Sequence, residues 1–195
     1  MPSNKKPEPM KKPKKAKPGW SDLKLQLSGL DRKELLKLVQ DLYAADKDNQ
    51  TFLHARFNLG DDVLKPYKKT IDHWVGPDVN FDDDLSVSKA KKAISDYRKA
   101  VGRPEGLAEL SVYYCEACNE LLEIGGLDDE GYYNALSNMF EQALKLVRSL
   151  DPKKRDTFVK RLDRVRIKAH DWGWGVGDDM DYLMEKYGFL DVILK

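Results

Sequence analysis

Residues 86–102, SVSKAKKAISDYRKAVG, decide the fold because their pattern is that of an amphipathic helix. Gly102 follows the last apolar position and provides a C-terminal stop. The apolar residues recur every three or four positions and share one helical face: Ala90, Ala93, Ile94, Tyr97 and Val101. The same spacing continues on both sides of this segment, and few stretches alternate as a strand does. The sequence therefore predicts an all-α protein.

Further helices are expected along the rest of the chain. DLKLQL (22–27) alternates like a strand, but it is short and isolated, so we favour one or two helical turns capped by Ser21. Asp31 and Glu34 have the spacing of a capping box. The later helices are expected near 48–57, 65–74, 104–124, 128–147 and 152–169, with a last one from about 178. We predict a single domain over 19–195, with about six to eight antiparallel helices in a bundle or a short superhelical stack.

Clusters of aspartates share one explanation. Residues 61–62, 82–84, 128–129 and 178–179 each precede a predicted helix. Aspartate accepts hydrogen bonds from the first free N–H groups of a helix and complements its dipole. We therefore interpret these clusters as helix starts and not as metal ligands. The stretch 76–86 is the longest expected loop.

The N-terminus differs in composition from the rest of the chain. Residues 1–18 carry a net charge of +6 and almost nothing apolar, whereas the other residues carry −5. Such a Lys/Pro-rich segment cannot bury enough surface to fold, so we predict a disordered tail. No run approaches a membrane span, and the lysines are not followed by the apolar stretch of a secretory signal. Two cysteines favour a reducing cytoplasm.

Several stretches resemble, in the same order, an uncharacterised bacterial family catalogued as a domain of unknown function. The resemblance covers roughly residues 21–188 and leaves out the lysine tail. It implies an all-helical cytosolic protein and supplies no catalytic residue. The stretches are FLHARFNLGDD (52–62), LSVSKAKKAISDYRK (85–99), LAELSVYYCEACNELLE (107–123), DDEGYYNALSNMFEQALKL (128–146) and GWGVGDDMDYL (173–183).

The stretch HDWGWGVGDD (170–179) is rich in residues that serve in ligand sites. Its glycines follow a helix and no strand, which argues against a nucleotide-binding loop. A calcium loop starting at Asp171 would place Tyr182 where a bidentate Glu is needed. We expect a structural corner, with Gly173 at positive φ, both tryptophans packed on the core and Asp178 capping the last helix. The alternative is a small-ligand or active-site pocket, formed by His170, Asp171, Trp172, Trp174 and Asp178.

The predicted helix 152–169 carries the most basic surface. Six of its cations fall within about 120° of the circumference at about 100° per residue. A solvated face paired with acids from neighbouring helices is one interpretation, and a face for nucleic acid or an acidic protein is the other. The six cations are Lys153, Lys154, Lys160, Arg161, Arg164 and Lys168.

Other chemistry-bearing residues form no recognisable site. Cys115 and Cys118 have the spacing of half a zinc site, no second pair exists, and we expect both to be buried. We predict no metal, cofactor or membrane partner. The leading hypothesis is a non-enzymatic interaction protein that binds a protein or nucleic acid. The alternatives are an accessory nucleic-acid-binding protein that uses the basic helix and tail, and an enzyme or ligand binder centred on the tryptophan corner.

Overall fold

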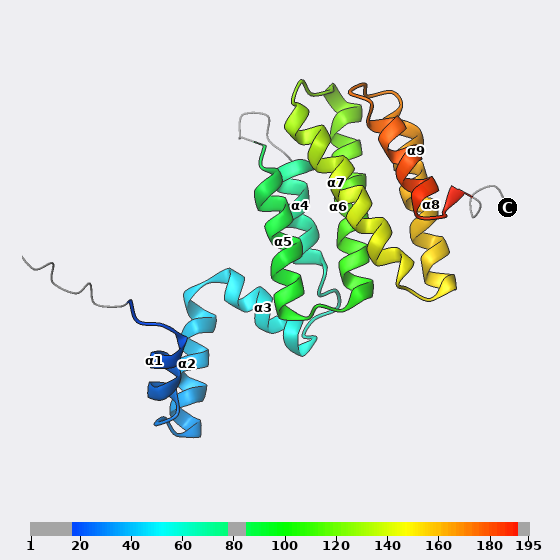
Figure 1. Ribbon diagram of the computed structural model, residues 1–195. Helices are drawn as coiled ribbons and strands as arrows, with labels where there is room; N and C mark the ends of the chain where they lie inside the picture. Colours follow the sequence, from blue (N-terminus) through cyan, green and yellow to red (C-terminus); the bar gives the residue numbers. More distant parts are fainter. Residues whose placement is uncertain (1–16, 78–84, 191–195) are drawn as a thin grey trace, which may run out of the picture. The chain divides into compact units, whose positions relative to one another are not determined.

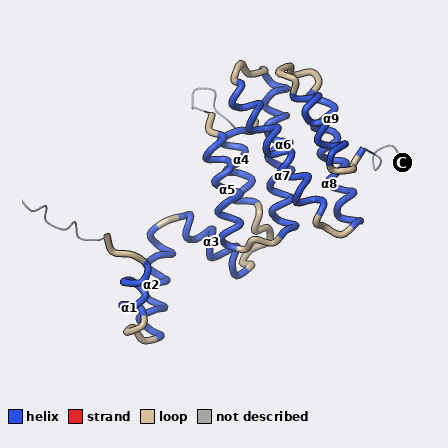
Figure 2. Tube along the Cα trace, viewed as in Figure 1, coloured by secondary structure: helices blue, strands red, loops and turns tan. Residues whose placement is uncertain are grey.

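The computed structural model describes residues 17–77 and 85–190, which form nine α-helices and no strand (Figures 1 and 2). The predicted all-α fold is confirmed, with one helix more than the expected six to eight. Residues 1–16 of the predicted tail and 78–84 of the predicted loop lie outside the described residues.

The chain divides into two compact units, Met1–Asp46 and Lys47–Lys195. The described part of the first unit holds α1 (Trp20–Leu27) and α2 (Arg32–Ala45). The apolar pattern predicts one continuous domain over 19–195, whereas the structure separates residues up to Asp46 from the rest. We refer to α1 and α2 together as the hairpin.

Local hydrogen bonds fix where the hairpin helices begin. The backbone N–H of Gly19 donates to Oδ2 of Asp22 at 2.7 Å, so the N-cap of α1 is Gly19 and not the predicted Ser21. At α2 the predicted capping box is confirmed. The N–H of Glu34 donates to Oδ1 of Asp31, and the N–H of Asp31 donates to Oε2 of Glu34, both at 2.8 Å. These bonds satisfy N–H groups that have no partner inside the helix.

The second unit contains the remaining helices of the described chain. Asp129 and Asp151 cap α7 and α8, since their carboxylates accept the N–H groups of Tyr132 and Lys154. The helices are α3 (Lys47–Phe57), α4 (Lys65–Val75), α5 (Val87–Ala100), α6 (Pro104–Gly125), α7 (Glu130–Arg148), α8 (Pro152–Ala169) and α9 (Val176–Lys186).

Helix α6 is the centre of the second unit. Its buried side chains occupy most of its circumference, and α4, α5, α7 and α8 all pack against it (Figure 1). A helix that is apolar on nearly every side is stable only when other helices surround it. No helix in the described part of the chain is both long enough and apolar enough to cross a membrane.

Of the three aspartate clusters that the structure describes, one supplies the side-chain cap of a helix, and one hydrogen-bonds just ahead of α4, whose N-cap Leu64 has no side-chain cap. Asp62 accepts the N–H of Leu64 at 2.9 Å just before α4, and Asp129 caps α7. The prediction that Asp178 caps the last helix is wrong, because the N-cap of α9 is Gly175 and Asp178 lies inside the first turn. The cluster 82–84 lies outside the described residues.

Candidate functional site

Three of the six cations on the predicted basic face are neutralised within the molecule. Lys154 pairs with Glu105 at 2.5 Å, Arg161 pairs with two glutamates, and Lys168 pairs with Glu123. All of these carboxylates belong to α6. Because the starts of α6 and α8 meet, and so do their ends, the two helices run in the same direction. The basic stripe of α8 therefore lies along an acidic stripe of α6.

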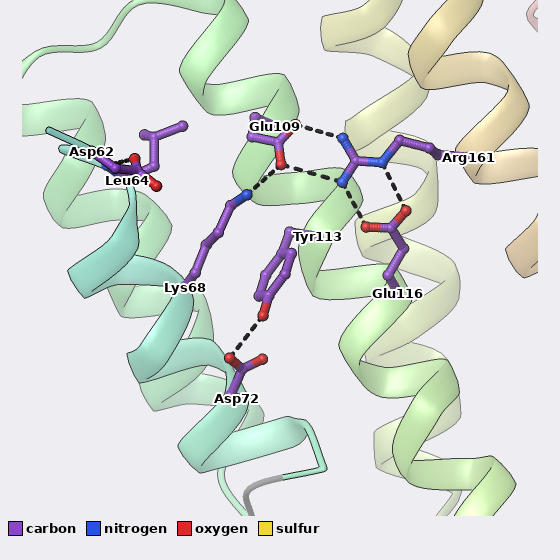
Figure 3. A network of polar contacts seen from close by, with 8 residues as sticks. All are labelled: Asp62, Leu64, Lys68, Asp72, Glu109, Tyr113, Glu116 and Arg161. Atoms are coloured by element: carbon purple, nitrogen blue, oxygen red, sulfur yellow. Dashed lines mark hydrogen bonds and ion pairs between the residues drawn. The ribbon is translucent and has the colours of Figure 1, made fainter.

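Arg161 makes the most extensive of these contacts (Figure 3). Its Nε and Nη2 donate to Oε1 and Oε2 of Glu116 at 2.7 and 2.6 Å. Its Nη1 and Nη2 donate to Oε2 and Oε1 of Glu109 at 2.5 and 3.2 Å. Lys68 of α4 donates to Oε1 of Glu109 at 2.6 Å. This network joins α4, α6 and α8, and its four side chains are only 19–27% exposed.

The electrostatics of the network favour its ionised form. Burial opposes the ionisation of Glu109, but the hydrogen bonds from Arg161 and Lys68 outweigh it and hold the pKa of this carboxyl below its usual range. The hydroxyl of Tyr113 donates to Oδ2 of Asp72 at 2.7 Å, and the Lys68 ammonium lies 4.7 Å from the centroid of the Tyr113 ring. The charged groups are directed at one another, so the network acts as a structural tie between helices.

The other three predicted cations, Lys153, Lys160 and Arg164, are exposed and form no ion pair with the described residues. The phosphate contacts that lysine and arginine make need side chains that are not already paired within the protein. The sequence held a signal for the pairing. The paired cations recur every seven residues along α8, and three of their glutamate partners recur every seven residues along α6.

The backbone of the tryptophan corner is left-handed at three successive residues. Gly173, Trp174 and Gly175 have φ values of +79°, +55° and +70°. The positive φ predicted for Gly173 is confirmed, and only the middle residue has a side chain that disfavours this region. Asp171 is exposed, and its backbone N–H donates to the carbonyl of Lys168 at 3.0 Å. The turn reverses the chain between α8 and α9.

The two tryptophans of the corner have different surroundings. Trp172 is partly buried, and its Nε1 donates to Oδ1 of Asn119 at 2.9 Å. Asn119 itself is buried in α6, with 3% of its surface exposed. Trp174 stacks on Tyr133 with ring centroids 6.1 Å apart, yet 56% of it is exposed. Trp172 therefore packs against the core, as predicted, whereas Trp174 contacts Tyr133 and is more than half exposed.

A cluster of possible metal ligands lies beside the corner. The ligand atoms of His170, Asp178 and Asp181 all lie within 4.8 Å of one another. Gly177 allows this approach, since a Cβ there would stand 2.6 Å from Nδ1 of His170. Nε2 of His170 lies 3.2 Å from one oxygen of Asp181, and Arg166 binds the other. The guanidinium already compensates this carboxylate, which disfavours a second cation beside it.

Sequence reasoning placed His170 and Asp178 in the candidate corner and did not include Asp181. The sequence spacing could have indicated Asp181, because Asp178 and Asp181 are three residues apart and share a face of α9. Arg166, which lies outside the predicted basic face, also contacts Asp163 at 2.8 Å. Asp163 belongs to α8 itself, and it is the contact of Arg166 with Asp181 that joins α8 to α9.

The cysteines of α6 are buried, as predicted. Cys115 and Cys118 have no exposed surface and form no disulfide. Burial raises the pKa of Cys118 to about 12 and that of Cys115 well above its usual value. Because the thiolate is the reactive and metal-binding form, these thiols are inert at neutral pH.

A groove that sequence reasoning did not predict lies between α3, α4 and α5. Its volume is about 530 Å³, within the range of small-molecule sites. Phe52, Tyr67 and Trp74 supply its aromatic walls. The ammonium of Lys89 lies 3.6 Å from the centroid of the Trp74 ring, and Lys92 pairs with a carboxylate of its own helix. The polar groups at the rim interact with one another, so the groove defines no particular ligand.

The hairpin exposes more apolar surface than any other part of the described chain. No residue of α1 or α2 is buried. In the second unit, three of the exposed large apolar residues lie on or just after α3, and the other four lie on α6, α8, α9 and the corner before α9. We define the hairpin surface by its ten exposed large apolar residues: Trp20, Leu23, Leu25, Leu30, Leu35, Leu36, Leu38, Val39, Leu42 and Tyr43.

Comparison of the chain with protein-family models, curated proteins and solved structures found no match.

Proposed function

We propose that the protein is a non-enzymatic interaction protein of the cytoplasm, and that the hairpin surface docks another polypeptide. The observation that carries this proposal is the hairpin itself, in which no residue is buried while ten large apolar side chains are exposed. Exposed apolar patches of this kind mark interaction sites. The two free, buried cysteines suit a reducing compartment.

The stability of short helices supports the same proposal. Helix α1 has 8 residues and α2 has 14. Isolated helices shorter than about 12–15 residues are marginal in water, and most helical stability in proteins comes from packing of an apolar face. A capping box satisfies the start of α2, and Asp22 accepts the N–H of Gly19 at the start of α1, but such caps contribute only about 1 kcal/mol each. The hairpin therefore needs a surface that covers it.

The chemistry of the hairpin surface favours a polypeptide over a nucleic acid. Residues 20–45 carry four basic and four acidic side chains, so their net charge is zero. Nucleic-acid binding depends on an excess of positive charge. On α8, the cations that would supply such an excess are half neutralised by α6.

A nuclease-treated pull-down with three full-length baits tests the proposal. One bait is the wild-type chain, one carries Leu36→Gln and Leu42→Gln in the hairpin surface, and the control carries Ile124→Gln and Ile167→Gln. The control residues are 60% and 56% exposed on the second unit. We expect the wild-type and control baits to retain the same proteins, including untagged copies of this chain, and the hairpin variant to lose them. Equal retention by all three baits, or retention that nuclease abolishes, contradicts the proposal.

A further inference from the structure

We propose that the polypeptide docked by the hairpin is a second copy of this chain, with two hairpin surfaces packed face to face as a four-helix bundle. This inference rests on the proposed function and names the partner. A two-fold symmetric interface uses the same patch on both chains, and C₂ dimers are the commonest protein oligomers. Four short helices with apolar faces directed inward form a stable core in water.

The apolar face of α2 is wider than one neighbouring helix can cover. At about 100° per residue, its apolar residues span an arc of about 160°. Leu36 and Tyr43 lie toward one edge of the arc and Leu38 and Leu42 toward the other, and all four are exposed by 37–61%. Helix α1 has only 8 residues, so it leaves much of this arc uncovered. A helix pair from a second hairpin supplies the missing neighbours.

The exposed area matches what a stable dimer needs. Leu25 lies about 160° from Leu23 on α1 and is left out of the count; the exposed fractions of the other nine residues, 37–68%, give on the order of 800 Å² of area per chain. Specific protein interfaces bury about 800 Å² per partner. Two hairpins therefore satisfy this requirement without any contribution from the second unit.

The charge distribution permits two identical hairpins to approach. The four acidic and four basic residues between 20 and 45 cancel, so the two copies do not repel each other. Some of these charges are also satisfied locally, because Lys37 pairs with Asp41 at 2.8 Å. A patch with a large net charge would instead require a partner of opposite charge.

The composition of the hairpin surface favours a permanent partner. Seven of its ten residues are leucines, and only one is a tryptophan and one a tyrosine. Homodimer interfaces are more apolar than those of non-obligate complexes. A permanent partner has to be present whenever the chain is, and a second copy always meets that condition.

Sedimentation equilibrium on the full-length wild-type chain tests this inference. The chain has a mass of 22.4 kDa, and we expect the measured mass to be about twice that value at micromolar concentration. We expect the variant with Leu36→Glu and Leu42→Glu to sediment as a monomer, because each dimer would then bury four carboxylates. The matched variant with Ile124→Glu and Ile167→Glu stays dimeric. A wild-type monomer at 100 μM, or a hairpin variant that stays dimeric, overturns the inference.

A second measurement on the wild-type chain does not depend on how a variant folds. Equal amounts of unlabelled and ¹⁵N-labelled chain are unfolded together in urea and refolded as a mixture, so that copies exchange, then treated with a lysine cross-linker and analysed by mass spectrometry. Mixed-isotope cross-links between copies are expected at Lys24, Lys33 and Lys37, and not at Lys160. If mixed-isotope cross-links are missing from the hairpin lysines, the second-copy inference fails. If the hairpin still retains a different protein in the pull-down, the proposed function survives that failure.

Discussion

Replacing Arg161 with methionine tests whether the basic stripe of α8 is structural. Methionine keeps most of the length and apolar character of the side chain but removes the guanidinium. Two carboxylates, those of Glu109 and Glu116, then face each other in a site where they are only 19% and 27% exposed. Lys160→Met is the matched control, since Lys160 is the exposed neighbour and forms no ion pair with the described residues.

The expected loss follows from the contacts that Arg161 makes. Breaking a buried ion pair by removing one partner costs about 3–5 kcal/mol. Lys68 remains on Glu109, and the site is partly exposed, so we expect Arg161→Met to lower the free energy of unfolding by about 2–3 kcal/mol at pH 7. This corresponds to a fall in Tm of about 5–10 °C for a domain of this size. Lys160→Met should change the free energy of unfolding by less than about 0.5 kcal/mol.

The pH dependence separates the ion pairs from simple packing. In the folded wild type the pKa of Glu109 lies below its usual value of 4.5. A depressed folded pKa gives stability that is fully present above the unfolded value and is lost as the pH falls through the folded pKa. The stability gap between wild type and Arg161→Met should therefore be full at pH 7 and shrink below about pH 4.5 as the carboxyls protonate.

Urea unfolding followed by circular dichroism at pH 7 and pH 4 measures both effects. The double variant Arg161→Met/Glu116→Gln should recover part of the lost stability, because it removes one of the two unpaired carboxylates. A variant Arg161→Met that is as stable as Lys160→Met would refute the structural role. A stability gap of the same size at both pH values would show that packing and not charge accounts for the loss.

Two further predictions concern the corner and the cysteines. Trp172→Phe removes the indole N–H and leaves Oδ1 of the buried Asn119 without its partner, so it should lower the free energy of unfolding in urea by about 1–3 kcal/mol. Trp174 is half exposed, so Trp174→Phe should lower it by less than about 1 kcal/mol. Equal losses for the two variants would contradict the structural role of Trp172. Cys115 and Cys118 should react with Ellman's reagent at pH 8 only after denaturant is added, because burial keeps both thiols protonated and inaccessible. Rapid reaction of the native protein would contradict this prediction.

Helix positions were predictable because their signals are local. The apolar period of 86–102 gave α5, and the capping box at Asp31 gave the start of α2. Boundaries were wrong where the backbone took an unusual path. Three successive residues with positive φ bring the start of α9 to Val176, so Asp178 lies inside the first turn and does not cap it.

The seven-residue spacing of the cations on α8 and of the glutamates on α6 is visible in the sequence, but the sequence does not show that these two helices are neighbours. The partners Glu116 and Arg161 are 45 residues apart, and the intervening α7 makes the two helices parallel. From the sequence alone, the glutamates of α6 are interpreted as a solvent-exposed face, whereas the structure places the cations of α8 beside them. The division of the chain after Asp46 was not predicted either, because it also depends on which helices pack together. Apolar periodicity shows that a helix has a face to bury and does not show what buries it.

The two units differ in how their apolar side chains are covered and their charged groups are paired. In the second unit, α6 is covered by other helices, and four of its five glutamates form ion pairs within the chain. The hairpin buries none of its own residues, and under the proposed function a docked partner stabilises it. If that partner is a second copy, dilution removes helical structure from residues 20–45 and leaves the second unit folded. The hairpin surface then couples the amount of protein present to the structure of its N-terminal unit.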